Sequence, residues 1–539
     1  MSSFSRSSSA GRSGRPSPWC RLGPSLVLAG VFATACGNGG GAAVDSPGPG
    51  TGGARGGRGA GGSGAAQVGD GGAAGQGTGG RAGGGSGGGE GGAAGAGEGS
   101  GGAGGADDDA GAEVGAGGGG GSGMGGSGPS DAGAPEVACT RMVMVENDAA
   151  LGPALAAAKP GDCLDLADGQ YLGVGISSKG TAAAPIVITA RHRLKASFTS
   201  NVTFTGAAWV TVQGFVLPGF KITDALHCRL SRSSLKPGGG MVVDGKSDYA
   251  RIDHNDIGGA SIATDVMHPG GLSTNTLIDH NYFHDLHAPH TITLGCCGPT
   301  YDYHDTGNVA EYNLFVNCMS GAELFSIKSS SSTVRYNTVR MSQGDIDIRA
   351  GRKNAIYGNY IFNGTINSGI RMYEDGHHIF NNYVESGRTI SVGPGHDGHA
   401  QVKDATIVFN TFVGPVRFGD DVNTVFANNI VTGPISNSVG LGGTAPITPV
   451  YKDNIVFPGP GPQTGFKVVD PKLTRMGELM VPGAGSPALG AAVTSFPFVP
   501  DDITGRTRGD KADIGAQQMS STPALRHPLT AAEVGPDAP

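Results

Sequence analysis

Asparagine followed by a short apolar pair recurs along the chain, and apolar and polar residues alternate just before it. Arg251-Ile-Asp-His and Thr333-Val-Arg-Tyr show this period-two pattern, which is typical of a β-strand. The asparagines lie 19 to 32 residues apart, at Asn255, Asn281, Asn313, Asn337, Asn359, Asn382, Asn410, Asn429 and Asn454. Short β-branched runs and a period of about 24 residues predict an all-β parallel β-helix. A β-propeller is disfavoured, because its blades need about 40 residues.

These asparagines are expected at one corner of the coil. There each side-chain amide can bond the turn backbone and the amide of the next rung, so that buried polar groups are paired. At the N-terminal end, Ala and Leu recur at three- and four-residue spacing over residues 147–159. This spacing predicts a short amphipathic helix that caps the open end of the coil.

The regions flanking the β-helix differ in composition. Four arginines, the apolar run 26–35 and then Cys36 predict a signal peptide over residues 1–36, too short to span a membrane. Small residues before Cys36 indicate a lipoprotein-type cleavage site, with plain secretion as the alternative. Residues 37–130 hold 47 of the 100 glycines, so 37–136 are expected to be a disordered linker. The β-helix is assigned to 137–517, and 518–539 to a disordered tail.

Six cysteines follow Cys36, at Cys139, Cys163, Cys228, Cys296, Cys297 and Cys318. An even number in an exported domain permits disulfides. Cys139 and Cys163 flank the first strand and helix and could link the N-terminal cap. The other pairings stay open, and buried thiols or one bridge are favoured over a metal site because no CxxC-type spacing is present.

Basic residues recur once per repeat in the middle of the chain. The pairs Ile327-Lys328, Ile348-Arg349 and Ile370-Arg371 are 21 and 22 residues apart. If each isoleucine points inward, the following cation points outward, and the three cations should stack within roughly 10 Å. Residues 326–371 hold seven Lys and Arg against two Asp, whereas from residue 137 onward 30 Lys and Arg face 35 Asp and Glu. A basic strip on an acidic body predicts an anionic polymer as ligand, and the lack of a basic domain with reading aromatics argues against nucleic acid.

The same region carries a specific resemblance. The motifs Glu311-Tyr-Asn-Leu-Phe, Gly321-Ala-Glu-Leu-Phe-Ser-Ile-Lys, Ser342-Gln-Gly-Asp-Ile-Asp-Ile-Arg and Gly369-Ile-Arg-Met-Tyr-Glu-Asp occur in that order. They resemble polysaccharide lyase family 6, the family of chondroitinase B and alginate lyases, and the likeness runs from about residue 140 to 515. The resemblance implies a right-handed parallel β-helix.

The resemblance also implies roles for side chains in β-elimination at a 4-linked uronate. Lys328 would be the general base, Arg349 the general acid, and Arg371 would grip a substrate carboxylate. Positive charge is needed there, because removing the proton beside a carboxylate adds a second negative charge. Neighbouring cations also favour the neutral form of Lys328 that a base requires. Arg349 stays protonated, so it is expected to stabilise the departing oxygen and relay a proton.

Further substrate contacts are expected from Tyr373, Glu374, His378 and His290. For Glu374 and His378 the alternative is an ordinary polar turn.

Calcium is a further implication of the resemblance. The family commonly holds Ca²⁺ with an asparagine on the preceding turn and two glutamates, seven and five residues before the lysine. Glu323 stands at the nearer position, but Gly321 stands at the farther one, and residues 287–295 contain no asparagine. Because Ca²⁺ takes six to eight oxygens, Glu323 alone would bind it weakly, so no cofactor is expected to be required, with Ca²⁺ as the alternative. His290, Arg371 or an ordered water could neutralise the carboxylate instead. Glu323 also has the wrong strand parity relative to Lys328 and needs a bulge to share the site.

These observations predict a monomeric, exported lyase, secreted or anchored at the cell surface or outer membrane through Cys36. Alginate is the first choice of substrate, and dermatan sulfate is the alternative. A non-catalytic polysaccharide-binding β-helix stays open. A hydrolase using Asp345 and Asp347 as a carboxylate pair ranks low, because no matching acid stands on a neighbouring turn.

Overall fold

The computed structural model describes residues 139–266, 273–295, 304–393, 400–437, 447–459 and 464–539. The expected signal peptide, Cys36, the expected linker, and Cys296 and Cys297 lie outside these residues. Within them, no helix combines the length and apolar character needed to cross a membrane.

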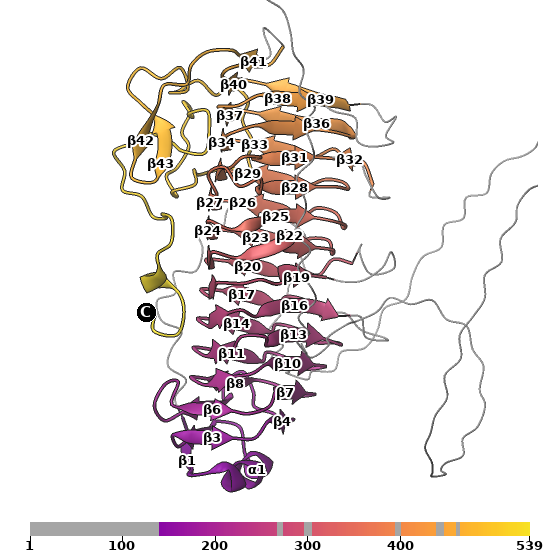
Figure 1. Ribbon diagram of the computed structural model, residues 1–539, viewed down its shortest axis with the longest axis vertical. Helices are drawn as coiled ribbons and strands as arrows, with labels where there is room; N and C mark the ends of the chain where they lie inside the picture. The colour runs from indigo at the N-terminus through magenta and orange to yellow at the C-terminus, as the bar shows by residue number, and fades with distance from the viewer. Residues whose placement is uncertain (1–138, 267–272, 296–303, 394–399, 438–446, 460–463) are drawn as a thin grey trace, which may run out of the picture. The chain divides into compact units, whose positions relative to one another are not determined.

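The described chain winds into a parallel β-helix, which confirms the predicted fold class (Figure 1). Each turn contributes one strand to each of three parallel sheets, so strands that follow one another in sequence lie in different sheets. The 12-stranded sheet, which carries the candidate site, contains β4 (Val174–Ile176), β7 (Val202–Thr205), β10 (Phe220–Thr223), β13 (Gly240–Asp244), β16 (Ser261–Val266), β19 (His290–Leu294), β22 (Met319–Ile327), β25 (Gln343–Ile348), β28 (Ile370–Met372), β31 (Ile390–Val392), β35 (Val416–Phe418) and β38 (Ile435–Asn437).

The other two large sheets complete each turn. The 15-stranded sheet contains β1 (Arg141–Val145), β2 (Asp162–Leu166), β5 (Ile186–Ala190), β8 (Val210–Gln213), β11 (Arg229–Ser231), β14 (Arg251–Asp253), β17 (Leu277–Asp279), β20 (Val309–Glu311), β23 (Thr333–Arg335), β26 (Ala355–Tyr357), β29 (His378–Phe380), β32 (Val402–Lys403), β33 (Thr406–Val408), β36 (Asp421–Ala427) and β39 (Ile447–Lys452). The 14-stranded sheet contains β3 (Gly169–Tyr171), β6 (Ala196–Phe198), β9 (Val216–Leu217), β12 (Ser234–Leu235), β15 (Asp256–Gly258), β18 (Tyr282–His284), β21 (Leu314–Val316), β24 (Thr338–Arg340), β27 (Tyr360–Phe362), β30 (Tyr383–Glu385), β34 (Thr411–Val413), β37 (Ile430–Val431), β40 (Asn454–Val456) and β41 (Phe466–Lys467). A separate antiparallel pair is formed by β42 (Leu473–Met476) and β43 (Leu479–Pro482).

The asparagine ladder is confirmed at all nine predicted positions. From Asn255 to Asn454 every member is fully buried, and each Nδ2 except that of the last donates to Oδ1 of the next at 2.9 to 3.0 Å. The same Oδ1 also accepts the backbone N–H of the preceding ladder residue, as Asn359 does from Asn337 at 3.0 Å. The ladder therefore fixes the register of neighbouring turns.

The N-terminal end of the coil is closed as predicted. Helix α1 (Asp148–Ala157) buries Leu151 and Leu155, and its N-cap Asn147 accepts a hydrogen bond from the backbone of Ala150. The Cys139–Cys163 disulfide joins the cap to the first turn, with 5.5 Å between the Cα atoms. Cys228 and Cys318 are buried free thiols.

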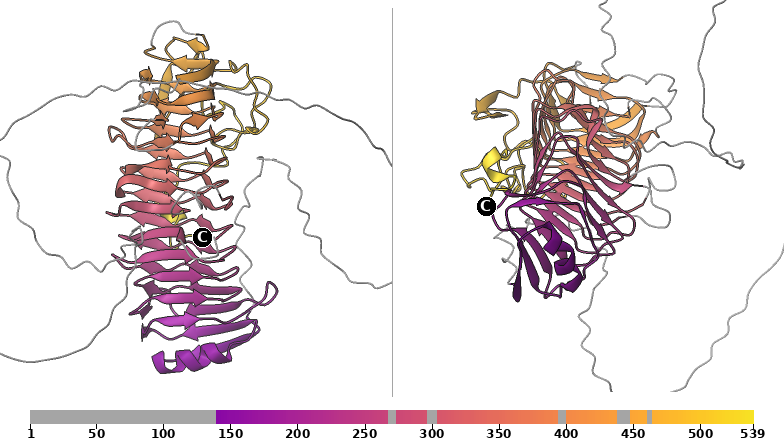
Figure 2. Two further views of the ribbon diagram at one scale, coloured as in Figure 1. Left: turned by 90° about the vertical axis from the view of Figure 1, so that its right-hand side faces the viewer. Right: turned by 60° about the horizontal axis from the view of Figure 1, so that its bottom comes forward.

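The prediction of a disordered tail over residues 518–539 is wrong. This segment runs back along the β-helix, shown in yellow in Figure 1 and Figure 2, and forms the 3₁₀ helix η1 (Ala531–Glu533). Leu529 and Val534 pack against Leu314, and the Leu529 N–H donates to Thr338 Oγ1 at 2.8 Å. Only two large apolar side chains anchor the segment, which explains why no hydrophobic pattern indicates its structure.

Candidate active site

The structure brings Lys328 and Arg349 together as predicted. Ile327 and Ile348 are paired in strands β22 and β25, and both are fully buried. Lys328 and Arg349 follow them directly, at the same edge of neighbouring strands. Neighbouring strands lie about 4.8 Å apart, so the two side chains leave the sheet side by side.

The predicted position of Arg371 in this stack is wrong. In the register of β25 and β28, Ile348 faces Met372 and Ile346 faces Ile370, so Arg371 lies opposite Asp347. The residue that follows Arg349 in the stack is Tyr373. The reason is the turn before β28, residues 363–369, which is longer than the turn 341–342 before β25. Sequence spacing alone does not reveal this insertion.

Arg371 instead belongs to an outward-facing row of the 12-stranded sheet. Strand register places Ser326, Asp347, Arg371, Ser391 and Arg417 in this row. Arg371 Nε donates to Asp347 Oδ2 at 2.9 Å, and Nη2 bonds the same oxygen. The Asp347 side chain is fully buried and that of Arg371 is 14% exposed, so the pair forms a floor beside the Lys328 and Arg349 edge.

Glu323 connects Arg349 at the strand edge with Arg371 in the floor. The expected bulge is present, because the pairing of β22 with β25 shifts register on both sides of Glu323. On the other side of β22, Glu323 lies opposite His290 of β19, with Oε2 3.2 Å from His290 Nδ1. Its other oxygen pairs with Arg349 and lies 3.7 Å from Arg371 Nη2.

Two more residues extend the charged network. Asp345 Oδ2 accepts a hydrogen bond from Arg388 Nη2 at 2.6 Å and lies 3.7 Å from Arg371 Nε. The sequence offered Asp345 only as half of a hydrolase pair and gave no sign of Arg388, which lies in the turn before β31. The group thus contains three buried carboxylates and three guanidinium groups: Glu323, Asp345, Asp347, Arg349, Arg371 and Arg388.

The surroundings shift the pKa values of two of these buried carboxylates in opposite directions. Burial raises the pKa of Glu323, but contacts with His290 and Ser326 and the charge of Arg349 outweigh burial and hold this pKa at about 2. For Asp347, burial dominates over the hydrogen bond and charge of Arg371, and its pKa rises to about 7. The charge of Asp347 therefore changes near neutral pH.

Several buried polar atoms of this site have no hydrogen-bond partner among the described residues. Within the part of the chain that the structure describes, Asp347 Oδ1, Ser391 Oγ and Arg388 Nε are buried without a hydrogen bond. An unsatisfied buried polar group costs about 1–3 kcal/mol. Such atoms in one network are typical of a site that water or a ligand completes.

The predicted continuous basic strip is wrong. Arg335 lies in the 15-stranded sheet and pairs with Glu311, and Arg340 lies in the 14-stranded sheet and pairs with Glu478, 2.8 Å away. A repeat of about 24 residues visits all three sheets, so a charge count along the sequence mixes three faces of the coil.

The other three residues predicted to contact substrate lie in different places relative to the charged network. Tyr373 lies beside the network, where burial raises the pKa of its hydroxyl to about 12 although the charge of Arg371 opposes this. Glu374 is buried in the following turn, at a φ of 69°, and its role in substrate contact stays a prediction. His378 is not brought to the network, because it starts β29 in the 15-stranded sheet and packs against Phe498 with ring centroids 4.7 Å apart.

The residues present do not fit a calcium ion at the position that the resemblance implies. Gly321 offers no ligand, and one oxygen of Glu323 faces Arg349 while the other faces His290. An ion there would lie against guanidinium groups with too few oxygens to fill its coordination shell.

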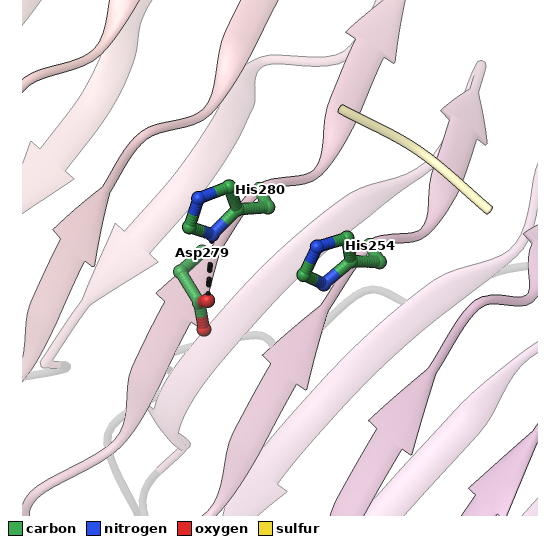
Figure 3. Close-up of side chains that lie close together, drawn as sticks. All are labelled: His254, Asp279 and His280. Atoms are coloured by element: carbon green, nitrogen blue, oxygen red, sulfur yellow. Dashed lines mark hydrogen bonds and ion pairs between the residues drawn. The ribbon is translucent and has the colours of Figure 1, made fainter. Parts of the chain in front are cut away.

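A second group of potential metal ligands lies on another face of the coil. His254, Asp279 and His280 have ligand atoms within 4.8 Å of one another (Figure 3). Asp279, however, accepts two hydrogen bonds from Arg251, at 2.9 and 2.7 Å, and a third contact from His280 Nδ1. The two imidazole rings lie nearly parallel with centroids 4.9 Å apart, so their in-plane lone pairs do not converge on one ion. This group is a structural stack between neighbouring turns.

Residues 239–457 match the family model described as chondroitinase B, a segment that includes Lys328, Arg349 and Arg371. No individual curated protein matches the sequence.

Solved structures share the fold. A variant of the family 6 alginate lyase AlyGC superposes with a TM-score of 0.57 and 21% identity, covering 73% of this chain and 58% of that chain. A mannuronic acid-specific family 6 lyase from human gut microbiota superposes with a TM-score of 0.51 and 20% identity, covering 61% of this chain and 90% of that chain. A family 6 polysaccharide lyase from Pseudopedobacter saltans superposes with a TM-score of 0.51 and 19% identity, covering 73% of this chain and 99% of that chain. At these identities the structures establish the fold alone.

The matched family model spans the turns that carry the charged network, and the fold agrees with it. This segment of the β-helix is therefore similar to the family described as chondroitinase B, and the solved structures share its fold.

Proposed function

We propose that this β-helix cleaves a 4-linked uronate polysaccharide by β-elimination. The observation that carries the proposal is the placement of Lys328 and Arg349 side by side after the paired Ile327 and Ile348, with Arg371 joined to them through Glu323. A fixed cation for the departing oxygen and a cation for the substrate carboxylate thus belong to one network, with a potential base next to it.

The reaction follows from this arrangement. Arg371 binds the carboxylate attached to C5 and offsets the charge that develops when the C5 proton leaves. Lys328 takes that proton, the electron pair of the C5–H bond forms the C4=C5 double bond, and the C4–O bond breaks. Arg349 stabilises the negative charge on the departing oxygen, which takes up one proton and becomes a new reducing end. The other product carries a 4,5-unsaturated sugar.

Alginate is the favoured substrate. Two of the similar structures are an alginate lyase variant and a mannuronic acid-specific lyase, which supports a polyuronate without sulfate. Dermatan sulfate is the second candidate, supported by the chondroitinase B description of the matching family model.

Ultraviolet absorbance of the unsaturated product tests both the reaction and the substrate. Purified protein is mixed with alginate, dermatan sulfate or polygalacturonate, and the wild type is compared with Lys328→Ala and with Lys246→Ala, an exposed lysine on another turn. We expect absorbance to grow with alginate for the wild type and for Lys246→Ala, and not for Lys328→Ala. New reducing ends without absorbance would indicate hydrolysis, and binding without either would indicate a non-catalytic module.

We also propose that the protein acts outside the cytoplasm, anchored through Cys36. The Cys139–Cys163 disulfide supports export, because such bonds persist in oxidising compartments. Membrane fractionation of the wild type and Cys36→Ser checks the anchor. Release of the variant into the soluble exported fraction is expected, whereas an unchanged distribution would leave plain secretion or another anchor.

A further inference from the structure

Arg371 is surrounded by carboxylates on the inner side of its guanidinium group. Nε and Nη2 both bond Asp347, Nε lies 3.7 Å from Asp345 Oδ2, and Nη2 lies 3.7 Å from Glu323 Oε1. The three carboxylate side chains are at most 2% exposed. A planar guanidinium therefore sits where three buried negative charges converge.

One edge of the same guanidinium stays open. Among the described residues, none accepts a hydrogen bond from Arg371 Nη1, and this nitrogen is not among the buried unsatisfied atoms. Nη1 carries two N–H groups, and one of them can donate to a carboxylate oxygen of a ligand. The acids thus fix Arg371 through Nε and Nη2 and leave Nη1 available for a ligand.

The charges of the network balance without an added ion. Glu323, Asp345 and Asp347 supply three negative charges when ionised, and Arg349, Arg371 and Arg388 supply three positive charges. Removing one member of a buried pair leaves an uncompensated charge, which destabilises the fold. A divalent ion beside Glu323 would upset this balance, whereas a guanidinium is part of it.

We propose that Arg371, fixed by Asp347, Asp345 and Glu323, performs in this chain the task that family members assign to a divalent cation, neutralising the carboxylate of the bound uronate. The inference rests on the proposed function and names three positioning residues for it. Asp347 is the principal one, since it makes both direct bonds to Arg371. Beside Arg349 and Arg388 of the same network, the ionisable groups next to it in the described part of the chain include Lys328, Tyr373 and His290.

The test uses thermal stability, which needs no turnover, and then activity. Arg371→Ala should melt at a lower temperature than the wild type, because Asp347 loses its partner. Methylguanidinium at millimolar concentration should restore part of the lost stability of Arg371→Ala. It should leave unchanged the wild type and Arg352→Ala, in which an arginine that is 54% exposed is removed. EDTA and Ca²⁺ should change neither the melting temperature nor the turnover of the wild type.

Two outcomes would overturn the inference. The first is a wild type that is stabilised or activated by Ca²⁺. The second is an Arg371→Ala variant whose melting temperature does not change with methylguanidinium. If Arg371→Ala does not fold, Arg371→Lys and Arg371→Gln fill similar volume. The inference requires a KM for Arg371→Lys at least tenfold below that for Arg371→Gln, and equal values would overturn it. A wild type with no lyase activity that still shows the methylguanidinium response would reject only the proposed reaction.

Discussion

Asp347 lies directly opposite Arg371 in neighbouring strands, and Arg371 Nε donates to Asp347 Oδ2 at 2.9 Å. Strand register places Arg371 outside the line formed by Lys328 and Arg349, and this contact holds its side chain in the floor of the sheet. The site therefore has two parts: an edge that can perform proton transfer and a floor that can bind a carboxylate.

Replacing Lys328 with alanine should lower kcat by about 10²–10⁴-fold, the usual contribution of a general base. The side chain is half-buried at the sheet edge and, in the described part of the chain, forms no ion pair, so its removal should leave the melting temperature nearly unchanged. Steady-state kinetics on alginate and circular dichroism measure the two effects. Activity close to that of Lys246→Ala would remove Lys328 from the role of base.

The rate should rise as the solution becomes alkaline. A lysine acts as a base only after losing its proton, which for lysines ordinarily happens well above neutral pH. A kcat/KM profile from pH 5 to pH 10 checks this, with Lys328→Ala as control. An acidic optimum would favour a carboxylate-driven hydrolase and reject the elimination.

Substrate affinity should depend on salt through Arg371. Exposed charge contacts are screened beyond about 8–10 Å at ionic strengths near 0.1 M, so KM of the wild type should rise with added salt. Arg371→Ala should raise KM by about tenfold at low salt, the effect of roughly 1.4 kcal/mol of lost binding, and flatten the salt dependence. Its effect on kcat should be smaller than that of Lys328→Ala. A variant with the salt dependence of the wild type would show that other cations hold the polymer.

Asp347→Asn should gain stability relative to the wild type as pH rises from about 4 to 7. Burial raises the pKa of Asp347 to about 7 in the folded state, whereas an unfolded aspartate titrates near pH 4. Between these values the folded wild type holds a proton that the unfolded chain has released, so its stability falls with pH, and asparagine removes this loss. Melting temperatures of both proteins across pH 4–8 provide the measurement. A constant difference would mean that Asp347 keeps its charge throughout this range.

The stability of the coil should depend on single ladder positions. Asn337 donates to two backbone carbonyls and to Asn359, and accepts from Asn313, all within the core. Asn337→Ala should lower the free energy of unfolding by at least about 1–3 kcal/mol, the cost of buried groups left unpaired. Asn423→Ala, at an exposed position within β36, should cost far less in the same denaturant titration.

The sequence predicted those parts of the fold that repeat and missed those that depend on turn length. Asparagine is needed at one fixed corner, so its recurrence marked every ladder position. The Ile-cation pairs repeat as well, and they gave the correct neighbour for Lys328. Arg371 was placed in the wrong row, because residues 363–369 lengthen one turn in a way that the local pattern does not show.

Arg388 and the tail escaped prediction for a related reason. Arg388 enters the network only through Asp345, 43 residues earlier in the chain, and no local pattern connects such a pair. The segment 518–539 has no periodicity, because its contacts are individual hydrogen bonds to successive turns of the coil.

That returning segment changes how the whole coil can come apart. Stacked repeats normally touch only their neighbours, so they can fray from one end like a one-dimensional chain. Here residues near the C-terminus bond Thr338 through Leu529, the backbone of His280 through Gly535, and Arg193 through Asp537. These contacts link turns that are far apart along the coil. Opening the early turns therefore also breaks contacts made by the last residues, and unfolding becomes more cooperative than in an open-ended solenoid.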